Sequence, residues 1–176
     1  QTLARLLKVN EKEIIFTSGG TESNNLALFG GAEANKRMGN HIITTAVEHA
    51  AVGQPVERLE QMGYEVTIVP VDERGVVRLD ALEKALREDT ILVSTMYVNN
   101  EVGAVMPVEE IARLVHEKSP KAFYHVDAIQ AFGKYRIYPE KLGIDMLSVS
   151  SHKIHGPKGV GFLYINDKVR VQPQIL

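Results

Sequence analysis

The sequence predicts an α/β fold, a three-layer sandwich in which helices cover both faces of a mainly parallel seven-stranded sheet. Seven short apolar segments have the length and composition of strands, and helix-like segments lie between most of them. Turn residues separate the two kinds of segment. Strands that alternate with helices are typical of parallel sheets, because each crossover connection places a helix against one face of the sheet.

The first half of the chain supplies three of the strands. After an opening segment with helical character, we expect strands at residues 13–17, 41–45 and 64–70 and helices at residues 21–37, 50–62 and 79–87. Leu26, Ala27 and Phe29 mark the packed side of the first of these helices, and Gly63 ends the second. Residues 72–75 are rich in turn formers and follow the third strand.

The second half supplies the other four strands. We expect them at residues 91–98, 122–126, 146–149 and 160–165, with one helix at residues 107–117 and one or two helical turns at residues 128–132. Pro107 suits the first turn of its helix, where a missing N–H group costs little. Gly156 and Pro157 form a sharp turn between the last two strands.

Composition narrows the class of protein. The 176 residues, 44% of them hydrophobic, suffice for one well-packed domain. A net charge of −2 without a basic block gives no reason to expect a nucleic acid or an anionic membrane as partner. The absence of cysteine excludes disulfides and thiolate metal sites within this sequence. Without an apolar run of about 18 residues or a signal peptide, we expect a cytoplasmic protein.

Polar residues of several kinds follow five of the predicted strands. Because the carboxyl ends of parallel strands meet at one edge of a sheet, we expect these residues to form a ligand site there. A rim built for structure alone would show mostly turn-forming residues. The candidate site residues are Gly20, Thr21, His49, Asn100, Asp127, Gln130, Ser150, His152 and Lys153.

Each candidate also has a structural explanation. Gly20 and Thr21 either cap a helix or hold an anion at its positive end. The segment lacks the Gly-Lys pair of a Walker loop, and no Gly-x-Gly-x-x-Gly motif supports a dinucleotide. Asp127 and Gln130 have the spacing of a capping box, but a carboxylate at a buried strand end also suits a ligand N–H⁺ group.

The remaining candidates are similarly ambiguous when each is taken alone. His49 is either a structural histidine or a flat ring that stacks on a flat ligand. Lys153 is either a solvated lysine or a reactive amine. His152 and His155 have only weak metal-ligand spacing and no nearby carboxylate, so we predict no metal site. Together, a phosphate cradle, a carboxylate, a stacking ring and an amine describe a site for pyridoxal 5′-phosphate (PLP).

Five segments resemble the class V aminotransferase superfamily, and most closely its cysteine desulfurase branch. They are FTSGGTESNNLA at 16–27, TAVEH at 45–49, VNNEVG at 98–103, HVDAIQ at 125–130 and SVSSHKIHGPKG at 148–159. They occur in order and extend over nearly the whole chain. The resemblance implies the fold of type I PLP-dependent transferases, with residues 1–176 as the PLP-binding large domain. The N-terminal arm and the C-terminal small domain of the family are absent, so we expect a fragment of a longer protein.

The resemblance also implies a role for each candidate residue. Lys153 would bond covalently to the cofactor aldehyde and then remove the Cα proton of the substrate, with its amine kept neutral in a partly desolvated, cation-rich pocket. Asp127 would pair with the pyridine nitrogen, and His49 would stack on the ring as the second catalytic residue. Gln130 would hydrogen-bond the ring hydroxyl, and Asn100 would lie close to that hydroxyl or to the substrate carboxylate. The phosphate would be held by Gly20, Thr21, Ser150 and His152.

In that branch of the family, L-cysteine becomes L-alanine and its sulfur passes as a persulfide to iron–sulfur cluster assembly. The implied partners are a second copy of the chain in a homodimer and a sulfur-acceptor or iron–sulfur scaffold protein. The persulfide-forming cysteine, a carboxylate-binding arginine and a phosphate-binding threonine of the second subunit are not in this sequence. We therefore expect these 176 residues alone not to complete sulfur transfer. A selenocysteine lyase, an aminotransferase and a non-catalytic fold relative remain alternatives.

Overall fold

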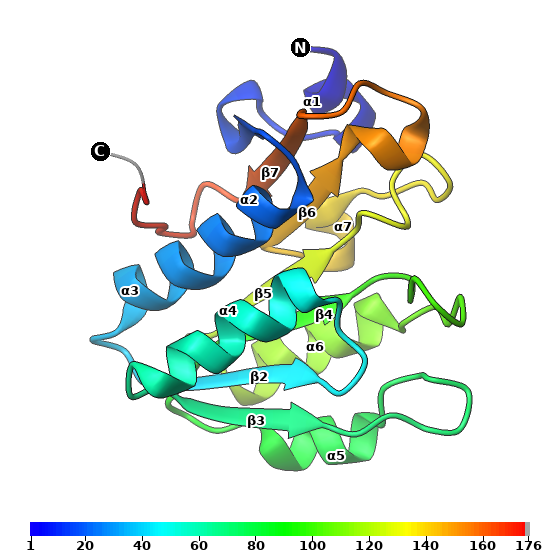
Figure 1. Cartoon of the computed structure of the whole chain (residues 1–176). Helices are drawn as coiled ribbons and strands as arrows, with labels where there is room; N and C mark the ends of the chain where they lie inside the picture. The colour runs from blue at the N-terminus through cyan, green and yellow to red at the C-terminus, as the bar shows by residue number, and fades with distance from the viewer. Residues whose placement is uncertain (175–176) are drawn as a thin grey trace.

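One mixed sheet forms the centre of the computed structural model, which describes residues 1–174 and has seven strands in the order β1-β7-β6-β5-β4-β2-β3 (Figure 1). The strands are β1 (Ile14–Thr17), β2 (His41–Thr45), β3 (Glu65–Val69), β4 (Thr90–Met96), β5 (Phe123–Asp127), β6 (Met146–Ser150) and β7 (Gly161–Ile165). The pairs from β3 to β6 are parallel, whereas β7 is antiparallel to both β6 and β1. The predicted mainly parallel sheet is confirmed.

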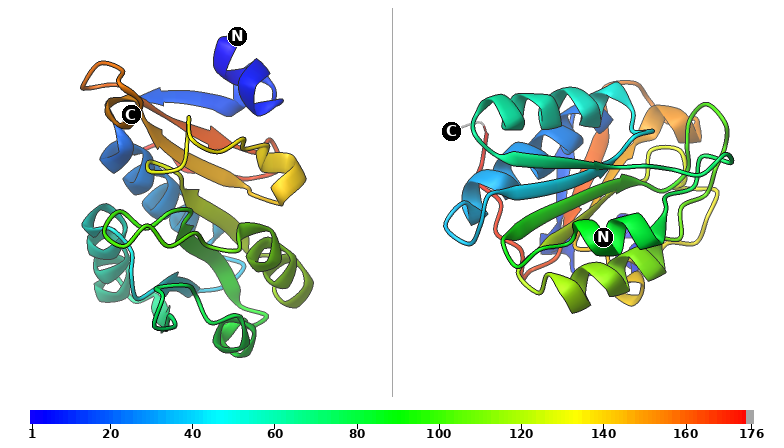
Figure 2. Two further views of the ribbon diagram at one scale, coloured as in Figure 1. Left: turned by 90° about the vertical axis from the view of Figure 1, so that its right-hand side faces the viewer. Right: turned by 90° about the horizontal axis from the view of Figure 1, so that it is seen from below.

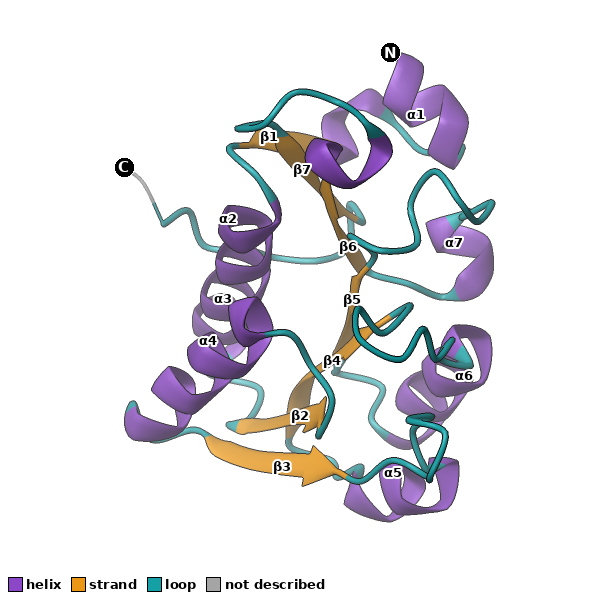
Figure 3. Cartoon of the chain, turned by 45° about the vertical axis from the view of Figure 1, so that its right-hand side comes forward, coloured by secondary structure: helices purple, strands orange, loops and turns teal. Residues whose placement is uncertain are grey.

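Helices cover both faces of this sheet. The helices are α1 (Thr2–Leu7), α2 (Gly20–Asn25), α3 (Gly31–Asn35), α4 (Ala50–Gln61), α5 (Leu79–Ala85), α6 (Val108–Lys118) and α7 (Pro139–Leu142). Figure 3 shows α2, α3 and α4 on one face and α5, α6 and α7 on the other. The right-hand view of Figure 2 shows α4 above the twisted sheet and the green helices α5 and α6 below it. The predicted three-layer sandwich is therefore confirmed.

Side chains that point alternately to the two faces of the sheet along the central strands fill a separate hydrophobic core on each face. Ile42 and Leu92 pack into the core beneath α2, α3 and α4. Their neighbours Ile43 and Val93 pack into the opposite core, which contains Ile111 of α6. Successive side chains of a strand point to opposite faces, so a strand covered on both faces is buried at every position. Both β2 and β4 are buried throughout, and their apolar residues Ile42–Ile43 and Ile91–Val93 supply both cores.

One predicted helical segment differs in the structure, and a second agrees with its prediction. The helix expected at residues 21–37 runs from α2 to α3 through a wider π-helical segment, Leu26–Gly30. Of the one or two helical turns expected at residues 128–132, the structure has a single turn, in which Phe132 N donates to Ala128 O at 2.8 Å. Gly133 ends this turn with a φ of +84°.

The helix α7 was not predicted, although its sequence holds the usual signals. Pro139 is the first residue of this helix, and Gly143 follows its end in the left-handed conformation. Proline at the start and glycine after the end are typical of helices. The helix has only four residues, which is too short to show a periodic apolar pattern.

The parallel part of the sheet decides where a ligand site can form. Strands β2, β4, β5 and β6 run in the same direction, so their carboxyl ends lie at one edge. The chain leaves that edge into the loop before α4, the loop after β4, the turn after β5 and the short 3-10 helix η3 (Ser151–Ile154). The start of α2 reaches the same edge, since α2 contacts both β6 and β7.

Close packing at Gly161 gives a test of this arrangement. A Cβ atom at Gly161 would lie 2.6 Å from Val149 O and 2.8 Å from Gly19 Cα, both backbone atoms. We expect Gly161→Ala to lower the free energy of unfolding by about 1–3 kcal/mol, because the backbone must shift to relieve the overlap. The urea midpoint of unfolding measures the change.

Gly53→Ala is the matched control. A Cβ atom at Gly53 in α4 would have no contact within 4 Å, and the same substitution should stabilise the protein by about 0.5–1 kcal/mol. Equal stability of the two variants would contradict the close approach between the start of β7 and the loop before α2.

Candidate active site

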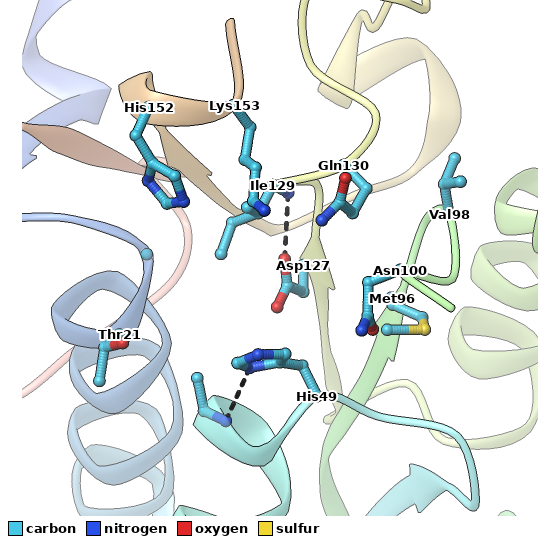
Figure 4. Close-up of a pocket in the computed structure, with 12 residues that line it drawn as sticks. Thr21, His49, Met96, Val98, Asn100, Asp127, Ile129, Gln130, His152 and Lys153 are labelled. Atoms are coloured by element: carbon cyan, nitrogen blue, oxygen red, sulfur yellow. Dashed lines mark hydrogen bonds between the residues drawn. The ribbon is translucent and has the colours of Figure 1, made fainter. Parts of the chain in front are cut away.

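A cavity of about 270 Å³ lies at the carboxyl edge of the sheet and is lined by segments from across the chain (Figure 4). The structure brings every predicted site residue except Ser150 into its wall. Ser150 lies just behind the wall, where its hydroxyl is 2.7 Å from His152 Nδ1. The lining residues are Gly20, Thr21, His49, Ala51, Met96, Val98, Asn100, Asp127, Ile129, Gln130, His152 and Lys153.

Asp127 provides the buried negative charge of this site. It is the last residue of β5 and is only 5% exposed. Within residues 1–174, its carboxylate has uncharged donors alone: Asn24 Nδ2 at 2.9 Å and Ile129 N at 3.0 Å. Burial raises the pKa of Asp127, while these two hydrogen bonds and the nearby His49 oppose that rise. The carboxylate is therefore suited to a cationic N–H group that enters the cavity.

His49 faces Asp127 across the cavity and is held by its own helix (Figure 4). It is the N-cap residue of α4, and its Nδ1 accepts a hydrogen bond from Ala51 N at 3.0 Å. Since Nδ1 accepts, the neutral ring must have its proton on Nε2. The cap thus fixes both the tautomer and the direction of the imidazole ring.

The start of α2 forms the polar end of the cavity. Gly19 precedes it with φ 154° and ψ −174°, a conformation that is nearly restricted to glycine. Glu22 accepts hydrogen bonds from Ser18 N and Ser18 Oγ, both at 2.6 Å, and these bonds lower the pKa of Glu22. The two hydrogen bonds join the loop before α2 to the first turn of the helix. The first N–H groups of a helix have no partner within the helix, so they are available to an anion.

A second hollow beside this helix start shares part of the wall. It is lined by Gly20, Thr21, Ser150 and His152, and also by Lys158 from the turn before β7. Lys158 was not among the residues predicted for the site. The signal for it is its place in the Gly-Pro-Lys-Gly turn at residues 156–159, which returns the chain to the same edge of the sheet.

Lys153 reaches toward the cavity from η3, directly after β6 (Figure 4). The expectation that its amine lies in a partly desolvated environment is wrong, because Lys153 is exposed in this structure. The reason is that η3 lies at the rim of the cavity, and none of its residues is buried. The side chain points toward Asp127 and Gln130 from the solvent side.

Sequence reasoning missed residues that support the site from within the sheet. Buried His125 of β5 is 2.8 Å from Ser94 Oγ of β4 through Nδ1, and 2.8 Å from Ser148 Oγ of β6 through Nε2. Burial lowers the pKa of His125 to about 3, so the ring is neutral. It links three parallel strands two residues before Asp127. Asn24 was also missed, although a buried amide in an amphipathic helix indicates a specific hydrogen bond.

Residues 1–174 contain no group of three or more His, Cys, Asp or Glu side chains arranged to hold a metal ion. In the same part of the chain, no helix has both the length and the apolar character needed to cross a membrane.

Comparison with known families is decisive for the class of protein. The family model for aminotransferase class-V matches residues 1–175. The chain belongs to the class V aminotransferase family. The match includes all five strand ends that form the cavity, and so agrees with the resemblance found in the sequence.

Named relatives of this class V chain are cysteine desulfurases. It is 53% identical over 163 residues to "Putative cysteine desulfurase IscS 1" of Bacillus subtilis, covering 93% of this chain and 42% of that protein. It is 48% identical to "Cysteine desulfurase, mitochondrial" of Eremothecium gossypii, covering 100% of this chain and 36% of that protein. The chain therefore spans less than half the length of these relatives.

Solved structures show the same fold. A "NIFS-LIKE PROTEIN" superposes with a TM-score of 0.95 at 48% identity, covering 98% of this chain and 47% of its own. A structure described as "SspA in complex with cysteine" superposes with a TM-score of 0.89 at 39% identity, covering 98% of this chain and 50% of its own. These likenesses support the predicted fold of type I PLP-dependent transferases.

The hydrogen bond from Asn24 to Asp127 gives a prediction for this site. In Asn24→Ala the charged carboxylate loses a buried donor, so the pKa of Asp127 should rise further above its ordinary value. We expect a loss of stability of about 1.5–3 kcal/mol at alkaline pH, where Asp127 is charged. The loss of stability should be smaller at acidic pH, because a hydrogen bond to the protonated carboxyl group is weaker than one to the carboxylate. Urea unfolding at the two pH values measures both.

The control is Asn25→Ala, which removes only an exposed hydrogen bond to Thr21 O. It should have a small effect that does not depend on pH. If both variants lost the same stability with the same pH dependence, the support of Asp127 by Asn24 would be refuted.

Proposed function

We propose that residues 1–176 are the PLP-binding large domain of a cysteine desulfurase that converts L-cysteine to L-alanine. The supporting observation is the meeting of Asp127, His49 and Lys153 around one cavity at the carboxyl edge of the sheet. Relatives named as cysteine desulfurases and a similar structure described in complex with cysteine favour this substrate. The parts of those proteins that this chain does not cover would complete the enzyme.

The chemistry of the cavity fits PLP. Asp127 is a buried carboxylate whose donors within the described residues are uncharged, and it can accept a further hydrogen bond from a protonated ring nitrogen. A Cβ atom at Gly20 would lie 2.1 Å from Ile129 Cδ1, so the absence of a side chain keeps the wall of the cavity in place. The cavity is near the lower end of the size range for small-molecule sites, as a small flat ligand requires.

Each residue would then have a distinct task. When bound, PLP supplies a ring that accepts electrons from the reacting Cα atom. Asp127 would hold the proton on the ring nitrogen, and His49 would lie against one face of the ring. The helix start at Gly20 and Thr21, with Ser150 and His152, would hold the phosphate. Gln130 would hydrogen-bond the ring hydroxyl, and Asn100 would lie close to that hydroxyl or to the substrate carboxylate.

Lys153 would carry out two steps with the same amine. Its Nζ would hold the cofactor covalently at the aldehyde group and, when free of that bond, would accept the Cα proton of the substrate. Both steps require a neutral amine. Because Lys153 lies on the rim, its side chain can reach into the cavity and withdraw from it without moving the sheet.

Sulfur transfer requires groups outside this sequence. The sulfur atom of L-cysteine leaves Cβ and is taken by a thiol, which becomes a persulfide, but the 176 residues contain no cysteine. We therefore place that thiol elsewhere in the complete protein. We further propose that the complete protein is a cytoplasmic homodimer that delivers sulfur to an acceptor or scaffold for iron–sulfur cluster assembly.

The covalent role of Lys153 leads to a direct test. PLP is added to the protein, the product is reduced with borohydride, and peptides are examined by mass spectrometry. We expect the pyridoxyl group on Lys153, because this amine alone would lie beside a bound aldehyde. Lys153→Ala should lose the label, whereas Lys121→Ala, at an exposed position with no predicted role, should keep it. Equal labelling of many surface lysines would refute the proposed site.

The same samples test the reaction class. In D₂O, the PLP-loaded protein should exchange the Cα proton of L-cysteine for deuterium, and Lys153→Ala should not. The chain should form no persulfide, since it has no thiol. Rapid release of alanine and sulfide by these 176 residues would contradict the need for an external cysteine.

A further inference from the structure

Glu48 lies directly before His49, but its carboxyl group points away from the cavity wall and into the protein. Its Oε1 accepts hydrogen bonds from Thr45 Oγ1 at 2.6 Å and from Met96 N at 3.0 Å. The other oxygen, Oε2, is buried and has no hydrogen-bond partner within residues 1–174. A buried polar atom without a partner is costly, so this carboxyl group is retained at the expense of stability.

The position of Met96 gives this contact its significance. Met96 is the last residue of β4 and is paired with Asp127 across the parallel ladder. Glu48 therefore connects the loop between β2 and α4 to the strand beside Asp127. The same loop ends at His49, whose ring is directed by the hydrogen bond from Ala51 N. That bond sets the direction of the ring, whereas the contact to Met96 sets the distance of the loop from the sheet.

We propose that Glu48 is a positioning residue for His49: its buried carboxyl group holds the loop between β2 and α4 against the end of β4 and so fixes the imidazole ring over the cavity. This inference rests on the proposed function, because it concerns the ring that would lie against the cofactor. Glu48 itself lines no part of that cavity, and acts through His49.

The protonation state of Glu48 makes the contact sensitive to pH. Burial raises the pKa of Glu48 to about 8, and the negative charge of Asp127 adds to the rise, whereas the bonds from Thr45 and Met96 oppose it. Tyr124 of β5, whose hydroxyl is 2.7 Å from Thr95 Oγ1, is a further titratable group close to Glu48. Below pH 8 the carboxyl group is thus neutral and can stay buried beside Asp127.

The contact between Glu48 and Met96 weakens as pH rises. The pKa of Glu48 in the folded protein lies above its ordinary value, so the contact is stable at low pH and weakens as pH rises toward 8. Above that pH, burial of a second negative charge next to Asp127 favours conformations in which Glu48 reaches water. Such conformations require the loop, and His49 with it, to move away from β4.

NMR of the histidine side chains tests this inference in the cofactor-free protein. The protein is labelled with ¹⁵N-histidine, and the ring signals of His49, assigned from His49→Asn, are followed across the range around pH 8. The wild-type protein should show a transition near that pH. Glu48→Gln keeps an oxygen acceptor for Thr45 and Met96 but cannot ionise, so its His49 signals should not change there. Glu48→Ala removes the contact to Met96 N at every pH, so its His49 ring signals should be displaced from the wild-type positions across the whole range.

Glu57→Gln is the matched control, because Glu57 is an exposed residue of α4 and should leave the wild-type transition unchanged. A wild-type transition that persisted in Glu48→Gln, or His49 ring signals in Glu48→Ala that matched those of the wild-type protein, would overturn the inference. In a second arm, Glu48→Ala should weaken PLP binding by about tenfold or more, because the stacking ring is misplaced. If PLP does not bind to the wild-type protein while the NMR result holds, the proposed function fails and the positioning role of Glu48 stands.

Discussion

The burial of the Asp127 carboxylate is the constraint on which the site depends. A charge removed from water must gain a partner, and within the described residues Asp127 has only the Asn24 amide and the Ile129 N–H group. The Asp127 carboxylate can accept a further hydrogen bond from the cavity, opposite the ring of His49. A ligand with a cationic N–H group therefore suits this fold, since that group would supply the missing positive charge.

The sheet provides the rigidity that this charge requires. His125 links β4, β5 and β6 through two serine hydroxyls, so the strand that ends at Asp127 cannot slide against its neighbours without breaking buried hydrogen bonds. Above this layer, Glu48 attaches the loop before α4 to the end of β4. Two buried carboxyl groups thus lie near one another, and the structure accommodates them because burial keeps Glu48 neutral below pH 8.

The strand ends that carry the site residues could be predicted from local sequence patterns. Contacts between residues far apart in the chain could not. Asp127, His49 and Lys153 were found because each follows an apolar strand, and parallel strands deliver their ends to one edge. Asn24 could not be found in this way, since its partner lies 103 residues further along the chain. The roles of the site residues remain predictions. The partly desolvated environment expected for the Lys153 amine was wrong, because the exposure of this side chain depends on where the short η3 segment lies at the rim of the cavity.

The pairing of Asp127 with a ring nitrogen is tested most directly by NMR of PLP labelled with ¹⁵N in its pyridine ring. When this PLP is bound to the protein, we expect the ring nitrogen to have the chemical shift of a protonated pyridinium at neutral pH. In Asp127→Asn, where no carboxylate holds the proton, the shift should be that of a neutral pyridine. An unprotonated ring nitrogen in the bound complex with Asp127 intact would contradict the account.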